Sequence, residues 1–98
     1  MKRKITKDYK ESLLEQLKDS KEAAAYLDAA LEEDDEVFLL ALRDVAEAVG
    51  GVSVVAKQTK LNRESLYRML SKNGNPELKS LRLILEKIGL RLSVAPAH

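Results

Sequence analysis

The chain has 98 residues, the length of one compact domain that buries a core without disulfides or metals. It contains no cysteine and its single histidine is the last residue, which excludes disulfide frameworks and thiolate metal sites and disfavours histidine chemistry. The net charge of +1 conceals an asymmetry, because residues 1–50 carry a net charge of −5 and residues 51–98 a net charge of +6. The second half has the charge that phosphate binding requires, and the first half suits a basic partner.

The composition favours an all-helical fold. Ala, Leu, Glu and Lys dominate, whereas Gly and Pro are few. No apolar run approaches the length of a membrane span, and the basic start is not followed by the apolar region of a signal peptide, so we expect a cytoplasmic protein with no membrane partner. We expect a disordered basic start over residues 1–7 and a single helical domain over residues 8–98.

The spacing of apolar residues predicts three helices in the acidic half, over residues 8–18, 20–32 and 36–49. Asp19 is a suitable N-cap for the second of them. The third is apolar around most of its circumference, so we expect it to be the central core helix. The pair Gly50-Gly51 ends it, because glycine suits the left-handed position after a helix.

An unbroken acidic run lies between the second and third predicted helices: Glu32, Glu33, Asp34, Asp35 and Glu36. One interpretation is a solvated turn in which Asp34 or Asp35 caps the next helix, where acidic groups suit the helix dipole. The other is that the run belongs to a docking surface for a basic protein, since complementary charge steers association. The sequence leaves both open.

The basic half contains the pattern of a helix-turn-helix over residues 53–71. Asn62 is suited to cap the second helix of the pair, and Leu66, Met69 and Leu70 then share one face. Such a helix presents its opposite face to the DNA major groove. The alternative is an ordinary helical hairpin with a solvated polar face.

The last part of the chain predicts one more helix and then a strand. Asn75 and Pro76 suit the N-cap and first residue of a helix that Gly89 ends. Residues 90–95 then alternate apolar and polar, which indicates a short β-strand. A lone strand needs a partner, so we expect antiparallel pairing in a homodimer, through Leu90, Leu92 and Val94. The alternative is an irregular tail packed on the core.

The string GGVSVVAKQTKLNRESLYRMLSKNGNPELKSLRLILEKIGLRL, residues 50–92, resembles the phage-repressor (XRE-type) helix-turn-helix class and the antidote proteins of HigBA/RelBE-type addiction modules. The preceding AAAYLDAALEEDDEVFLLALRDVAEAVGG is similar to the N-terminal half of those antidotes. The resemblance implies an all-α, five-helix, phage-repressor-like domain with a C-terminal strand. One departure is Lys60, which occupies the turn position where the family usually has glycine.

The same resemblance implies a HigA-type antitoxin. Such a protein neutralises a small basic RelE/HigB-like mRNA-interferase toxin and represses its own operon by binding double-stranded operator DNA as a dimer. The runner-up is a stand-alone XRE-type transcriptional regulator with no toxin partner, and a third class is a structural interaction module with a vestigial motif. We expect no enzyme, no cofactor and no metal site, because the sequence has no Gly-rich phosphate loop and no cluster with metal-ligand spacing.

The first residues of the second motif helix reach base edges in this class of protein. Carried over by position, the expected base readers are Arg63, Glu64 and Arg68, because arginine pairs with guanine and glutamate accepts from cytosine. The residues expected to contact phosphates are Ser53, Lys57, Asn62, Ser65, Tyr67 and Lys72. Gln58 suits either role.

Two of these assignments have alternatives. Glu64 lies at a helix start, where a carboxylate stabilises the helix dipole or pairs with Arg68 four residues later. The ring of Tyr67 is suited to packing against the edge of the domain instead of contacting phosphate. The toxin contacts expected on the acidic run are likewise a hypothesis that rests on charge alone.

Overall fold

A computed structural model of the chain describes residues 6–97. It contains six helices: α1 (Lys7–Gln16), α2 (Ser20–Glu33), α3 (Asp35–Ala48), α4 (Val52–Thr59), α5 (Arg63–Met69) and α6 (Leu78–Lys87). The expected all-α class is confirmed. The apolar spacing predicts all six of these helices, whereas the five that the family resemblance implies is wrong. The helix α1 has its own cap: the N–H of Tyr9 donates to Oγ1 of Thr6 at 3.1 Å.

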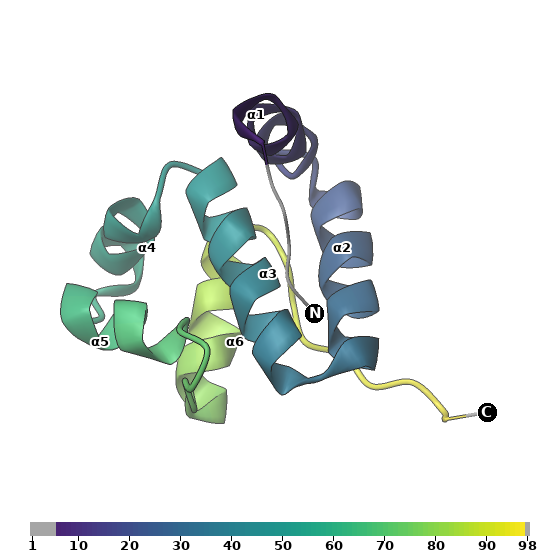
Figure 1. Cartoon of the computed structure of the whole chain (residues 1–98). Helices are drawn as coiled ribbons and strands as arrows, with labels where there is room; N and C mark the ends of the chain where they lie inside the picture. The colour runs from purple at the N-terminus through teal and green to yellow at the C-terminus, as the bar shows by residue number, and fades with distance from the viewer. Residues whose placement is uncertain (1–5, 98) are drawn as a thin grey trace.

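The helix α3 occupies the centre of the molecule and packs against α1, α2 and α4 (Figure 1). Its buried side chains include Leu42, Val45 and Ala46, none of which has any exposed surface. A hydrogen bond from the hydroxyl of Tyr26 to a carboxylate oxygen of Asp44, 2.6 Å long, links α2 to α3. The all-round apolar pattern of α3 therefore reflects packing on several sides at once.

Short polar side chains start α2, α3 and α5 as the sequence predicts. Asp19 accepts from the N–H groups of two residues in the first turn of α2, at 2.8 and 3.3 Å. Asp34 accepts from the N–H of Val37 at 2.8 Å, so it caps α3 and also ends α2. Asn62 accepts from the N–H of Ser65 at 3.1 Å and caps α5. Each bond satisfies a backbone donor that the helix leaves unpaired.

The start of α6 differs from the prediction. Asn75 is not its N-cap and Pro76 is not its first residue, because the helix begins at Leu78. Glu77 precedes it with extended backbone angles, φ −66° and ψ 150°, and makes no side-chain capping bond. Residues 75–77 belong to no regular element, so the helix starts two residues later than expected.

The C-terminal strand is not present. Residues 90–97 have no regular secondary structure, and no strand occurs in the part of the chain that the structure describes. A β-strand needs a neighbouring strand to complete its backbone hydrogen bonds. A single copy of the chain offers residues 90–95 no such strand, so their alternating pattern does not produce one. Instead, Leu90 packs on the core and its N–H donates to the carbonyl of Leu85 at 2.7 Å.

The start of the chain is described only in part. The helix α1 already begins at Lys7 with Thr6 as its cap, so the last residue of the expected disordered start is helical. Residues 1–5 of that start lie outside the described residues. Among residues 6–97, no helix combines the length and the apolar character that crossing a membrane requires.

Lys60 adopts left-handed backbone angles, φ 61° and ψ 19°, in the turn between α4 and α5. A side chain in this region costs about 1 kcal/mol, because Cβ approaches the following carbonyl. We expect Lys60→Gly to raise the free energy of unfolding by up to about 1 kcal/mol in denaturant titrations. Lys60→Ala is the matched control, because it removes the same charge but keeps Cβ. Equal stabilisation by both variants would assign the effect to charge.

Candidate nucleic-acid interface on α4 and α5

A three-residue turn joins α4 to α5. The hydroxyl of Thr59 is buried and donates to the carbonyl of Val55 at 2.8 Å, while it accepts from the N–H of Leu61 at 3.3 Å. Lys60 then takes its left-handed angles and Asn62 caps α5. The turn is thus held at both ends by side-chain to backbone hydrogen bonds, and these set the direction in which α5 leaves α4.

Two buried leucines anchor α5 to the hydrophobic core. Leu66 and Leu70 have no exposed surface and belong to one core cluster with Val55 of α4. Residues two apart on a helix lie about 200° apart around its axis, so Arg68 points directly away from both leucines. Glu64 lies four residues before it and shares its side of the helix. The prediction that Leu66 and Leu70 face inwards is confirmed, and Met69 beside them is half-buried.

The residues predicted to contact DNA lie on the outer sides of α4 and α5 and in the loop that follows. Exposed side chains are Lys57, Gln58, Asn62, Arg63, Glu64, Arg68 and Lys72. Half-buried ones are Ser53, Ser65 and Tyr67. The left-handed Lys60 adds another exposed cation to the same segment. The structure therefore presents a predominantly cationic surface in which Glu64 is the only acidic member of the predicted set.

Two predicted contacts are constrained by the local geometry. The carboxamide oxygen of Asn62 is used for capping, which leaves its NH₂ group as the donor for a phosphate. In residues 6–97, Glu64 and Arg68 do not form an ion pair. The pairing alternative for Glu64 therefore has no support, whereas its position in the first turn suits the helix dipole.

Two arginines lie over the ring of Tyr67. The guanidinium carbon of Arg63 is 5.7 Å from the ring centroid, and that of Arg43 in α3 is 5.3 Å away. The ring is half-buried and also packs against the core, so the packing alternative for Tyr67 describes part of its environment. Sequence reasoning missed Arg43, since it lies 24 positions before Tyr67 in the acidic half and no local pattern connects the two.

A shallow groove of about 530 Å³ runs along the other side of α5. Its lining includes Asn62, Ser65 and Arg68, which sequence reasoning had assigned to DNA. Glu77, just before α6, also lines it and adds a negative charge. The predicted residues are consequently divided between the two flanks of α5, with Arg63 and Tyr67 on the α3 side and Ser65 on the groove side.

The acidic run forms the corner between α2 and α3, and all five of its side chains are exposed. The predicted cap is confirmed as Asp34. Asp35 and Glu36 lie in the first turn of α3, where their charges favour the helix dipole. Glu32 and Glu33 end α2, where the dipole disfavours negative charge and no basic residue offsets it. Capping and helix dipoles therefore do not account for Glu32 and Glu33.

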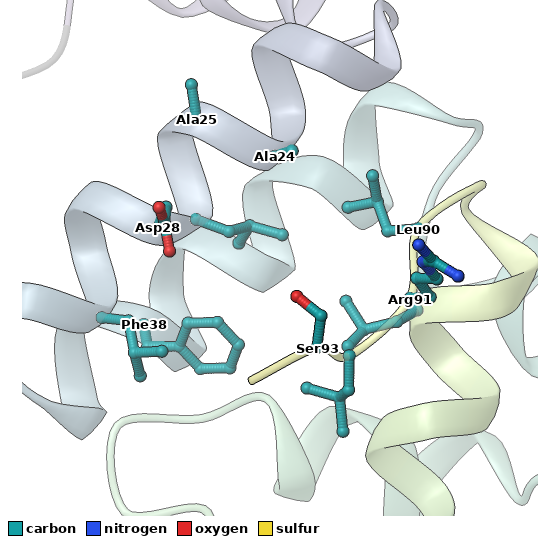
Figure 2. Close-up of a pocket in the computed structure, with 11 residues that line it drawn as sticks. Ala24, Ala25, Asp28, Phe38, Leu90, Arg91 and Ser93 are labelled. Atoms are coloured by element: carbon teal, nitrogen blue, oxygen red, sulfur yellow. The ribbon is translucent and has the colours of Figure 1, made fainter. Parts of the chain in front are cut away.

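Two of the three residues predicted for dimerisation border an apolar groove between α2 and the C-terminal tail, about 350 Å³ in volume. Figure 2 shows Phe38 pointing into the space between α2 and the tail, with Asp28 on one wall and Ser93 on the other. Leu90 and Leu92 line it. Val94 lies beyond the groove with 99% of its surface exposed, and this single copy of the chain places no partner against it.

Comparisons with known proteins cover nearly the whole chain. The model of a family described as probable addiction module antidote protein matches residues 8–96, from the second residue of α1 to the C-terminal tail. An uncharacterized protein of Haemophilus influenzae is 35% identical over 81 residues, which is 82% of this chain and 82% of that protein. No solved structure matches the chain significantly.

Proposed function

The chain belongs to the family of probable addiction module antidote proteins, and on that premise we propose that it is the antitoxin of a toxin–antitoxin module. The family description implies a cognate toxin as its partner. The proposed toxin is a small basic protein of the RelE/HigB-like mRNA-interferase class, which the sequence resemblance implies. The protein would act by binding this toxin and not by catalysis.

The acidic corner between α2 and α3 is the proposed toxin-binding surface. The position of Glu32 and Glu33 supports this assignment, because their charges are exposed and destabilise the C-terminal end of α2. Residues that cost stability where they stand are often kept for binding. Three further acidic residues follow directly, so the corner concentrates negative charge that would attract a basic protein.

The second part of the proposal is that α4 and α5 form a helix-turn-helix that binds operator DNA and represses the module's own genes. The single observation that supports this part is the orientation of α5: its leucines are fully buried while Arg63, Glu64 and Arg68 are exposed. This matches what a recognition helix needs in order to enter a major groove. Regulation would involve a homodimer, as half-site recognition in this motif requires.

Co-expression with the adjacent small reading frame tests the antitoxin proposal. We expect the neighbour alone to arrest growth, and this chain to restore growth and to co-purify with it. A harmless neighbour, or none, would reject the antitoxin role and leave a stand-alone DNA-binding regulator. Salt-dependent binding to DNA from upstream of the gene tests the second part, and its absence would reject that part alone.

Arg63 and Lys72 should affect DNA binding differently. We expect Arg63→Ala to cost about 1–3 kcal/mol on the preferred operator and to relax specificity, because an arginine reads base edges. Lys72→Ala should weaken binding to all sequences alike and reduce the salt slope by about 1, as for a phosphate contact. Titrations against operator and random duplexes measure both. Equal losses on the two duplexes for Arg63→Ala would contradict its base-reading role.

Reversing the charges of Glu32 and Glu33 should move stability and binding in opposite directions. For the E32K/E33K variant we expect the association rate with the toxin to fall about tenfold at low salt. The free energy of unfolding should rise by about 0.3–1 kcal/mol, because cations suit the end of α2. Stopped-flow mixing and denaturant titration measure the two quantities. An unchanged association rate would remove both residues from the toxin-binding surface.

A further inference from the structure

We propose that Arg43 of α3 is a further DNA-phosphate contact and that Tyr67 positions both Arg43 and Arg63 for binding. The inference rests on the proposed helix-turn-helix and extends that interface to a third helix. It begins from one geometric observation: the guanidinium carbons of Arg43 and Arg63 lie 5.3 and 5.7 Å from the centroid of the same ring. Both distances are within the range of cation–π attraction, about 6 Å.

Arg43 has an unusual position in the charge pattern of the chain. It is the only Lys or Arg between Lys21 and Lys57, a stretch in which every other charged residue is acidic. Figure 1 shows α3 in the middle, with α2 on one side of it and the pair α4 and α5 on the opposite side. The contact with Tyr67 places the Arg43 guanidinium on the α5 side. The single cation of this stretch is therefore directed toward the proposed DNA-binding helix and away from the acidic corner.

The carboxylates nearest to Arg43 on its own helix are engaged elsewhere. Asp44 accepts from the hydroxyl of Tyr26 at 2.6 Å. Glu47, four residues after Arg43, forms an ion pair with Lys10 of α1 at 3.2 Å. Across residues 6–97, no ion pair involves Arg43. Its guanidinium is held by an aromatic ring, which leaves its N–H donors available to an anion.

The spacing of the two arginines suits one stretch of DNA. Because both distances are measured to one centroid, the two guanidinium carbons are at most 11 Å apart. That is less than the width of the major groove, about 12 Å. Arg63, at the start of α5, can reach base edges while Arg43 contacts a phosphate at the rim of the same groove. The ring of Tyr67 reduces the freedom that both side chains would lose on binding.

The experiment measures binding to the upstream DNA of the gene and to a random duplex, between about 50 and 200 mM salt. We expect Arg43→Ala to weaken binding to both duplexes about three- to tenfold and to lower the salt slope by about 0.9. Lys21→Ala is the matched control, because it removes the same charge from α2, on the far side of α3. An unchanged slope for Arg43→Ala, or the same change for Lys21→Ala, would overturn the contact.

Variants of Tyr67 test the positioning role. Tyr67→Phe keeps the ring and should bind within about twofold of the natural chain, whereas Tyr67→Leu should lose about tenfold. In the Arg43→Ala background, Tyr67→Leu should cost less than it does alone, because one of its two arginines is already gone. Equal losses for the Phe and Leu variants would assign the effect to the hydroxyl and overturn the proposal. If the natural chain binds no DNA at any salt concentration, that result rejects the helix-turn-helix proposal itself, and with it the roles of Arg43 and Tyr67.

Discussion

Replacing Leu66 with alanine is expected to lower the free energy of unfolding by about 3–5 kcal/mol. The Leu66 side chain has no exposed surface and lies in the core cluster between α5 and α4. Truncation removes its burial energy and leaves a cavity that rigid neighbours only partly fill. Since whole domains are stable by about 5–15 kcal/mol, this one change removes a large part of the total.

The loss should also reach the proposed DNA-binding surface. The helix α5 has seven residues, too few to be stable alone, so it depends on Leu66 and Leu70 for its position. We therefore expect Leu66→Ala to reduce DNA affinity although Leu66 itself does not reach the outer face of α5. Denaturant titration and DNA titration measure the two effects. The matched control is Leu78→Ala in α6, where the leucine is 66% exposed and the expected cost is below about 1 kcal/mol. Equal costs for both leucines would contradict this account.

Gly74→Ala is expected to destabilise the protein by about 2–4 kcal/mol. A Cβ at this position would lie 2.1 Å from the carbonyl oxygen of Met69, 2.7 Å from its carbonyl carbon and 2.9 Å from the carbonyl oxygen of Arg68. All three are backbone atoms at the end of α5, so no side-chain rotation can relieve the overlap. The loop must move away from α5, and the bond from the Gly74 N–H to the carbonyl of Ser71 is expected to break.

A second glycine separates this steric effect from backbone strain. Gly74 has φ outside the left-handed region, whereas Gly89 has φ +87° and nothing within 4 Å of an added Cβ. Gly89→Ala should therefore cost only about 1 kcal/mol, from strain alone. Thermal unfolding of the two variants measures the difference. If Gly74→Ala were no worse than Gly89→Ala, close packing of the loop against α5 would not be the reason for this glycine.

Features that depend on a few neighbouring residues could be predicted from the sequence. The caps Asp19, Asp34 and Asn62 each bond to an N–H two or three residues away, so the local sequence suffices to find them. The same holds for the inward face of α5, which follows from helix periodicity. The family was also recognisable from the sequence, because the resemblance extends through most of the chain.

The predictions that were wrong concern the start of the last helix, the tail and the five-helix count that the resemblance implies. Asn75 and Pro76 are good starting residues by type, yet both lie before the helix, which begins at Leu78. Residues 90–95 alternate like a strand, but a strand exists only where a second strand supplies its hydrogen bonds. The tail instead lines the apolar groove of Figure 2, opposite α2. The dimer and the toxin surface remain predictions.

The sequence by itself determined the helical class, the caps Asp19 and Asn62, the buried face of α5 and the family, because each depends on residues close together in the chain or on the pattern as a whole. For α3 it offered Asp34 or Asp35, and the structure selects Asp34. Only the tertiary structure decided that Arg43 and Tyr67 meet, 24 positions apart. This contact depends on how α3 and α5 are placed by the packing of the core. No periodicity or cap records that placement, since it is set by the summed burial of side chains from several helices.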